Sequence, residues 1–135
     1  MAIQWSTTAR NDMLDGIETS ISTTPKLRIY TGSAPASCAA AATGTMLAEM
    51  DLPSDWMAAA SSGSKAKAGT WEDSNANDTG TAGYFRIWDS AGTTCHMQGT
   101  ITATSGGGDM ELDNTSIASG QSVTVSTFTL TAPGA

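Results

Sequence analysis

Apolar and polar residues alternate along many short stretches of this chain, and such alternation predicts β-strands with one buried face. The clearest stretch is 83–88, where Phe85 and Ile87 alternate with larger amphipathic side chains. Further strands are expected at 27–31, 45–52, 94–103, 110–112 and 123–130, with a hairpin formed by 56–60 and 64–71. About eight short strands separated by turn residues predict a mainly β fold, either an antiparallel β-sandwich or a jelly-roll-like barrel.

One N-terminal segment departs from this pattern. In 9–21 the apolar residues recur at the spacing of a helix, and the hydroxyl side chains of 6–8 precede it as candidate caps. We therefore predict one N-terminal amphipathic helix whose apolar stripe covers a face or an end of the sheet. The pattern leaves 1–8 as a short, partly apolar arm and 131–135 as a loose tail of a single domain, 1–135.

The length and charge of the chain exclude several classes of protein. Its 135 residues suit one domain with a real core, since a chain of this size buries roughly two thirds of its unfolded surface. The net charge of −7 disfavours nucleic acid and anionic membranes as partners. No apolar run approaches the ~20 residues of a transmembrane helix, and the N-terminal residues lack the pattern of a secretory signal. We expect a chain that is made and folded in the cytoplasm.

The cysteines and the histidine do not predict a catalytic or metal site. His96 is the single histidine, and on a strand it would face away from Cys95, so the two cannot readily share an ion or form a catalytic pair. Cys38 and Cys95 have two interpretations: buried thiols in a reducing compartment, or one disulfide if the protein leaves the cell.

The carboxylates do not predict a catalytic or metal site either. The stretch 73–77 begins like a calcium loop but lacks the later glycine and glutamate, so 72–80 is expected to be a polar, mobile loop. Asp109, Glu111 and Asp113 would lie on one strand face about 6.5–7 Å apart, too far to share one ion tightly without other ligands. The sequence therefore predicts no enzyme, no metal and no cofactor.

Two groups of residues are candidates for contact with other proteins. Tyr84, Arg86 and Trp88 share one strand face, and exposed aromatic and arginine side chains are typical of protein interfaces. A second sheet packed on this face is the alternative. Ile3 and Trp5 make the arm apolar, so it could reach a neighbour by strand addition.

Four segments give the chain a family resemblance: 26–36 (KLRIYTGSAPA), 80–89 (GTAGYFRIWD), 92–100 (GTTCHMQGT) and 107–121 (GGDMELDNTSIASGQ). In them the chain resembles a family of small proteins that tailed bacteriophages and prophages encode beside their head and tail structural genes. The resemblance implies a virion structural protein, and within that class we favour a capsid decoration (cement) protein. It implies the major capsid protein or another virion protein as partner, a homo-oligomer such as a trimer, and a place on the capsid surface.

Two other functions remain as alternatives from the sequence. One is a tail, neck or fibre-associated module of the virion. The other is a carbohydrate or cell-surface binding module in which Trp56, Trp71 or Trp88 stacks on the ligand.

Overall fold

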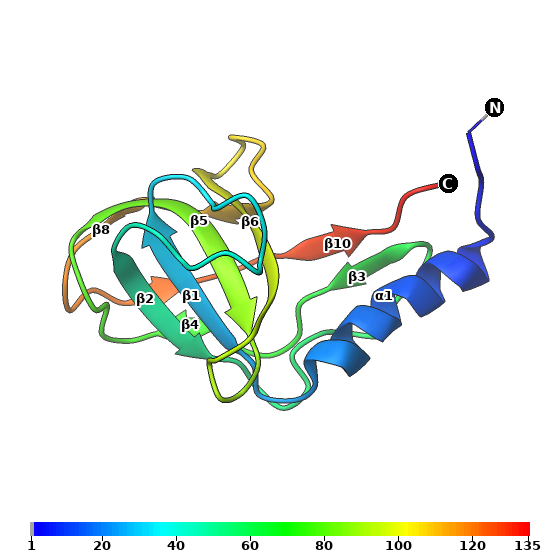
Figure 1. The fold of residues 1–135 in the computed structure, drawn as a ribbon, viewed down its shortest axis with the longest axis horizontal. Coiled ribbons are helices and arrows are strands. Elements are labelled where there is room, and N and C mark those ends of the chain that lie inside the picture. Colours follow the sequence, from blue (N-terminus) through cyan, green and yellow to red (C-terminus); the bar gives the residue numbers. More distant parts are fainter. Residues whose placement is uncertain (1) are drawn as a thin grey trace.

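The chain folds around a curled six-stranded sheet, which the computed structural model describes with the rest of residues 2–135 (Figure 1). The strands lie in the order β2 (Met46–Asp51), β1 (Lys26–Thr31), β5 (Gly80–Trp88), β6 (Cys95–Ala103) and β7 (Met110–Leu112), and β8 (Ser116–Ile117) pairs with the start of β5. The sheet curls into a half-barrel. The prediction of a mainly β fold with one N-terminal helix is confirmed.

The last pair of the sheet, β6 and β7, is parallel, so the sheet is mixed and not wholly antiparallel. After β6 the chain turns back at once and places Met110 beside Ile101. Gly106 and Gly108 permit this short return, because a Cβ added to either would lie within 2.8 Å of Thr102 atoms. The glycine run therefore forms a turn, as its composition predicts, but one that leads into a parallel strand.

Two small two-stranded sheets accompany the main one. β3 (Ser64–Ala66) pairs with β10 (Thr129–Thr131), and β4 (Glu72–Asp73) pairs with β9 (Val123–Thr124). The β4–β9 pair lies beside β2, whereas the β3–β10 pair extends away from the half-barrel next to the N-terminal helix (Figure 1). A bridge between Met57 and Lys67 retains part of the predicted hairpin. These pairs bring the C-terminal third of the chain back onto its middle.

The stretch 72–80, expected to be a mobile loop, is fastened to the outer edge of β2. The Asp73 carboxylate accepts a hydrogen bond from the Glu49 amide at 3.0 Å. The Asn77 amide donates to the Leu47 carbonyl at 2.7 Å. These contacts cover a strand edge that would otherwise be free to pair with another chain.

The helix α1 (Thr7–Ile21) begins two residues before the predicted segment, because the Ser6 hydroxyl caps it by accepting from the Ala9 amide at 3.1 Å. It packs against β3 and runs beside β3 and β10, away from the half-barrel (Figure 1). The helix thus covers the small β3–β10 sheet, and Ile21 in its last turn joins the main core. No helix in residues 2–135 is both long and apolar enough to cross a membrane.

Aromatic side chains fill the space between the main sheet and the segments packed on it. The Trp71 ring lies 6.1 Å from Trp56 and 5.6 Å from Phe128, measured between centroids. Phe128 meets Phe85 of β5 edge to face at 5.5 Å. This cluster connects the inner face of the half-barrel to the segments that lead into β4 and β10.

Candidate functional site

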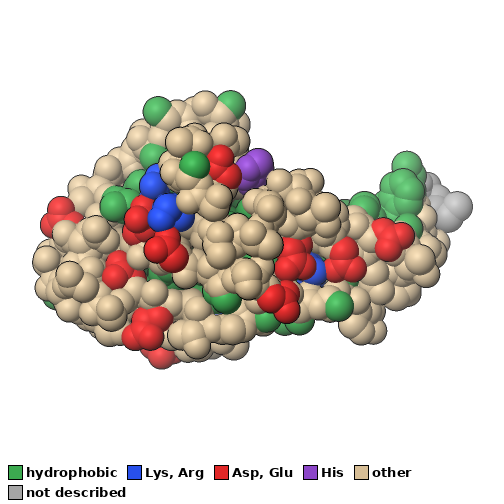
Figure 2. Space-filling model, turned by 90° about the horizontal axis from the view of Figure 1, so that it is seen from below, with side chains coloured by type: hydrophobic (Ala, Val, Ile, Leu, Met, Phe, Trp, Pro, Cys, Tyr) green, Lys and Arg blue, Asp and Glu red, His purple; other side chains and the backbone are tan. Residues whose placement is uncertain are grey.

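The large hydrophobic side chains that are exposed in residues 2–135 all lie on the N-terminal arm and on α1. They are Ile3, Trp5 and Met13, with 73%, 48% and 39% of their surface exposed. We call these three residues the apolar tip. Figure 2 shows hydrophobic side chains gathered at the narrow end of the molecule, and Figure 1 shows that the arm and α1 project from the half-barrel. Met1, the first residue of the predicted arm, lies outside the described residues.

A hollow along α1 extends the apolar surface from the tip toward the half-barrel. It has a volume of about 350 Å³, and its lining includes Met13, Ile17 and Ile21 from the helix and His96 from β6. Met13 thus belongs both to the tip and to this hollow, whose lining also includes Gly16 and Ser20.

The C-terminal residues hold the tip in place. The Trp5 amide donates to the Gly134 carbonyl at 2.7 Å, and the indole ring packs directly on the Gly134 backbone, where a Cβ would overlap with Trp5 Cδ1. Arg10 donates to the Ala132 carbonyl from Nη2 at 2.9 Å, and the Ala132 amide donates to the Gly63 carbonyl at 3.0 Å. The tail, expected to be loose, is thus hydrogen-bonded as far as Gly134.

The second predicted contact surface is not exposed, so that expectation is wrong for Tyr84 and Arg86, both fully buried. The loop 32–45 lies over them. The Tyr84 hydroxyl donates to the Thr43 carbonyl at 2.6 Å and accepts from the Thr43 amide at 2.9 Å. Arg86 Nη2 donates to the Ser37 carbonyl at 3.1 Å. A loop of the same chain, and not a second sheet or a partner, covers this face.

Trp88 lies at the border of the covered face and is half-buried. The guanidinium carbons of Arg28 and Arg86 lie 5.0 and 5.5 Å from the centroid of its ring. Arg28 is also paired with Glu49, whereas Arg86 has no carboxylate within ion-pair distance in residues 2–135. The cation–π contact with Trp88 therefore provides part of the electrostatic balance for the buried charge of Arg86.

Tyr84→Phe is expected to lower the free energy of unfolding by about 1.5 kcal/mol, because the hydroxyl makes two hydrogen bonds to the Thr43 backbone. Because phenylalanine keeps the ring in place, the only interactions removed are those that hold the loop 32–45. Urea unfolding measures the cost, and amide exchange at Thr43 should become faster. Thr43→Ala is the control, since it keeps the backbone groups that Tyr84 binds. Equal stability of Tyr84→Phe and the parent would show that these bonds do not hold the loop.

The proposed stacking role of two tryptophans is contradicted. Trp56 and Trp71 are fully buried. Their indole N–H groups donate inside the protein, to the Ser22 carbonyl at 2.9 Å and the Ala68 carbonyl at 3.1 Å. Neither ring presents a face to a carbohydrate.

The predicted carboxylate row serves the glycine turn. Asp109 accepts from the Thr100 amide at 2.9 Å, and Glu111 accepts from the amides of Ser105 and Gly107 at 3.1 Å each. In residues 2–135 no group of three histidine, cysteine or acidic side chains is arranged to hold a metal ion. These carboxylates thus stabilise the return between β6 and β7.

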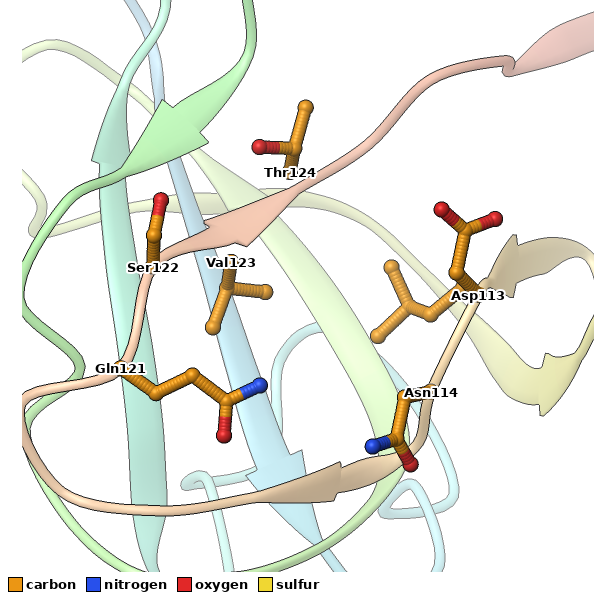
Figure 3. A pocket seen from close by; sticks show the side chains of 7 residues that line it. Asp113, Asn114, Gln121, Ser122, Val123 and Thr124 are labelled. Atoms are coloured by element: carbon orange, nitrogen blue, oxygen red, sulfur yellow. The ribbon is translucent and has the colours of Figure 1, made fainter.

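A small polar cavity of about 180 Å³ lies between the segment after β7 and the segment that enters β9. Figure 3 shows the amide groups of Asn114 and Gln121 pointing toward one another across it, with Asp113 on its rim. Ser122, also in the lining, donates from its hydroxyl to Glu72 at 2.7 Å. The cavity offers hydrogen bonds and one carboxylate to a small polar group.

Comparisons with protein-family models, curated proteins and solved structures give no match for this chain. The candidate site therefore rests on geometry alone. The apolar tip is the candidate for contact with another protein, since the sequence-predicted residues Ile3 and Trp5 are exposed there beside Met13.

Proposed function

We propose that this chain is a structural protein of a tailed-bacteriophage particle, and that it decorates the capsid by binding the major capsid protein through its apolar tip. The resemblance in sequence supports the class of protein. The mode of attachment rests on one observation: Ile3, Trp5 and Met13 are all exposed, and they lie on an arm and helix that project from the half-barrel (Figures 1 and 2). Large exposed apolar patches on a folded domain mark contact sites.

A single tip would bind weakly. Burying each of its three side chains contributes at most about 1.5–3 kcal/mol, and because association itself costs roughly 4–15 kcal/mol, little remains as net affinity. Several tips on one homo-oligomer would bind together, and the combined affinity would exceed that of one tip by orders of magnitude. We therefore propose that the protein acts as an oligomer, with a trimer favoured.

The stabilising effect on the shell follows from mass action. A protein that binds the assembled lattice and not the free subunits shifts the equilibrium toward the lattice. The net charge of −7 favours a neutral or basic acceptor surface, since opposite charges speed the encounter and like charges oppose it.

Light scattering coupled to size exclusion, followed by co-sedimentation with capsid shells of the phage that encodes the chain, tests this function. We expect a trimer that binds the shells to saturation. A monomer that stays in the supernatant at every concentration would contradict the proposal. Labelled protein at the tail, neck or fibres of whole particles would support the alternative virion position instead.

Ile3→Ser is expected to weaken attachment to shells about tenfold per tip, because it removes most of the apolar area of a side chain that is 73% exposed. The fold should not change, and circular dichroism checks this. Ala41→Ser is the matched control, an apolar-to-polar change at an exposed position of the loop 32–45. If Ile3→Ser binds as tightly as the parent, the arm does not make the contact.

A further inference from the structure

The loop 32–45 carries one of the two cysteines and is held firmly on the sheet. Besides its bonds to Tyr84 and Arg86, its Pro35 carbonyl accepts from Gln98 Nε2 of β6 at 2.7 Å. This bond lies three residues before Cys38, and the Ser37 carbonyl beside Cys38 accepts from Arg86. The position of Cys38 over the sheet is therefore set by contacts on the segment just before it.

This position brings Cys38 to the thiol of Cys95, the first residue of β6. Both cysteines are half-buried free thiols, and both line one cavity of about 570 Å³ together with Arg86 and Trp88. Cys95 Sγ donates to the Met97 carbonyl at 3.4 Å, which fixes its side chain. Two thiols far apart in the sequence thus line one cavity, close enough for Cys38 to affect the pKa of Cys95.

We propose that Cys38 and Cys95 are a paired redox site, which forms an intramolecular disulfide on reaction with a low-molecular-weight disulfide such as oxidised glutathione. The Cys38 thiolate attacks one sulfur of oxidised glutathione and releases one glutathione thiolate. Cys95 then attacks the Cys38 sulfur of the mixed disulfide and releases the second glutathione. Two protein thiols are oxidised, one glutathione disulfide is reduced, and the two thiol protons end on the two glutathione molecules.

The surroundings of the thiols explain this order. Burial, and after it the contact with Cys38, raises the pKa of Cys95 to about 12, which disfavours Cys95 as the first nucleophile. Once Cys38 is in a mixed disulfide, it has no thiol proton and no charge. The part of the rise in the Cys95 pKa that Cys38 causes then disappears. The Arg86 guanidinium favours the Cys95 thiolate and would assist the second step.

The bond would tie the loop 32–45 to the start of β6 and restrict the unfolded chain across a long segment. A disulfide that closes a loop of this length should raise the melting temperature by roughly 5–15 °C. The site does not depend on the proposed attachment, because neither cysteine belongs to the apolar tip.

The experiment treats the whole chain with excess oxidised glutathione at pH 8 and counts thiols under denaturing conditions. We expect two free thiols per chain before treatment and none after it. Mass spectrometry should show a single chain that has lost two hydrogens. The melting temperature should rise, and a reductant should reverse the rise. Cys38→Ser and Cys95→Ser are the controls, each compared with itself before and after treatment, and neither should gain thermal stability. Unreacted thiols, two glutathione adducts on one chain, or disulfide-linked dimers would overturn the proposal.

Discussion

Trp71→Ala is expected to lower the free energy of unfolding by about 4 kcal/mol, the largest loss anticipated from a single substitution in this chain. The Trp71 side chain is fully buried between the rings of Trp56 and Phe128. Alanine would leave a cavity that the neighbouring rings cannot fill, because Phe128 is itself held edge to face by Phe85. A domain of this size is stable by only about 5–15 kcal/mol, so the variant should be close to unfolding.

Urea unfolding followed by far-ultraviolet circular dichroism measures this loss. Trp5→Ala is the matched control, since it removes the same side chain from a position where it is 48% exposed. It should cost less than about 1 kcal/mol and act on attachment instead. If both variants lost the same free energy, the aromatic cluster would not be the centre of the core.

The alternation of apolar residues is a reliable guide to strands here because it depends on local geometry. The run 83–88 lies within β5, and 94–103 coincides with β6 apart from its first residue. The helix was predictable for the same reason. Its first turn begins at Thr7, two residues before the apolar stripe, because the Ser6 cap and not hydrophobicity decides where the backbone becomes helical.

What covers each strand face was not predictable, because alternation shows that two faces differ but not what lies against them. Tyr84 and Arg86 are on the face opposite Phe85 as expected, yet the loop 32–45 buries them and bonds to them through the Thr43 backbone and the Ser37 carbonyl. The alanines and glycines of that loop give no signal of such a role. Ile3 and Trp5 were predictable as candidates because an arm before a helix has few neighbours that can bury it.

Lys65 is another residue whose role the sequence does not reveal, and Lys65→Met is expected to cost about 3 kcal/mol of unfolding free energy. Its side chain is only 1% exposed. Lys65 Nζ lies 2.6 Å from Asp15 and 2.9 Å from Glu18 of α1, and donates to the Ala58 carbonyl at 2.8 Å. Methionine keeps the volume of the side chain but removes the ammonium group that these acceptors bind. Because both carboxylates are partly exposed to water, we expect a cost at the lower end of the range for breaking a buried ion pair.

The loss should be concentrated at the contact between α1 and β3. Amide exchange in α1 should therefore become faster in Lys65→Met before it changes in β5. Lys67→Met is the matched control, two residues further along the chain, where Nζ makes one hydrogen bond, to the Gly69 carbonyl, and lies 5.7 Å from the centroid of the Trp71 ring. If the two variants were equally stable, the buried cation would not hold the helix.

The pH dependence of stability separates the charge of Lys65 from its packing. The hydrogen bond from Lys65, and after it the one from the Ala60 amide, lowers the pKa of Asp15 below its usual 3.8. Burial opposes the charge of Lys65, but the hydrogen bonds to Asp15 and Glu18 outweigh it and raise the pKa of Lys65 above its usual 10.5.

When folding lowers the pKa of a carboxyl group, its ionised form stabilises the folded protein at every pH above the pKa of the unfolded state. This stabilisation disappears as the pH falls through the pKa of the folded state. A lysine with a raised pKa favours folding below its unfolded pKa, and this contribution disappears as the pH rises through the folded pKa. The stability difference between the parent and Lys65→Met should therefore be constant between these limits, and should shrink below pH 3.8 and above pH 10.5. A difference that stayed constant in acid would mean that Lys65 acts by packing alone, and that α1 is held by shape and not by charge.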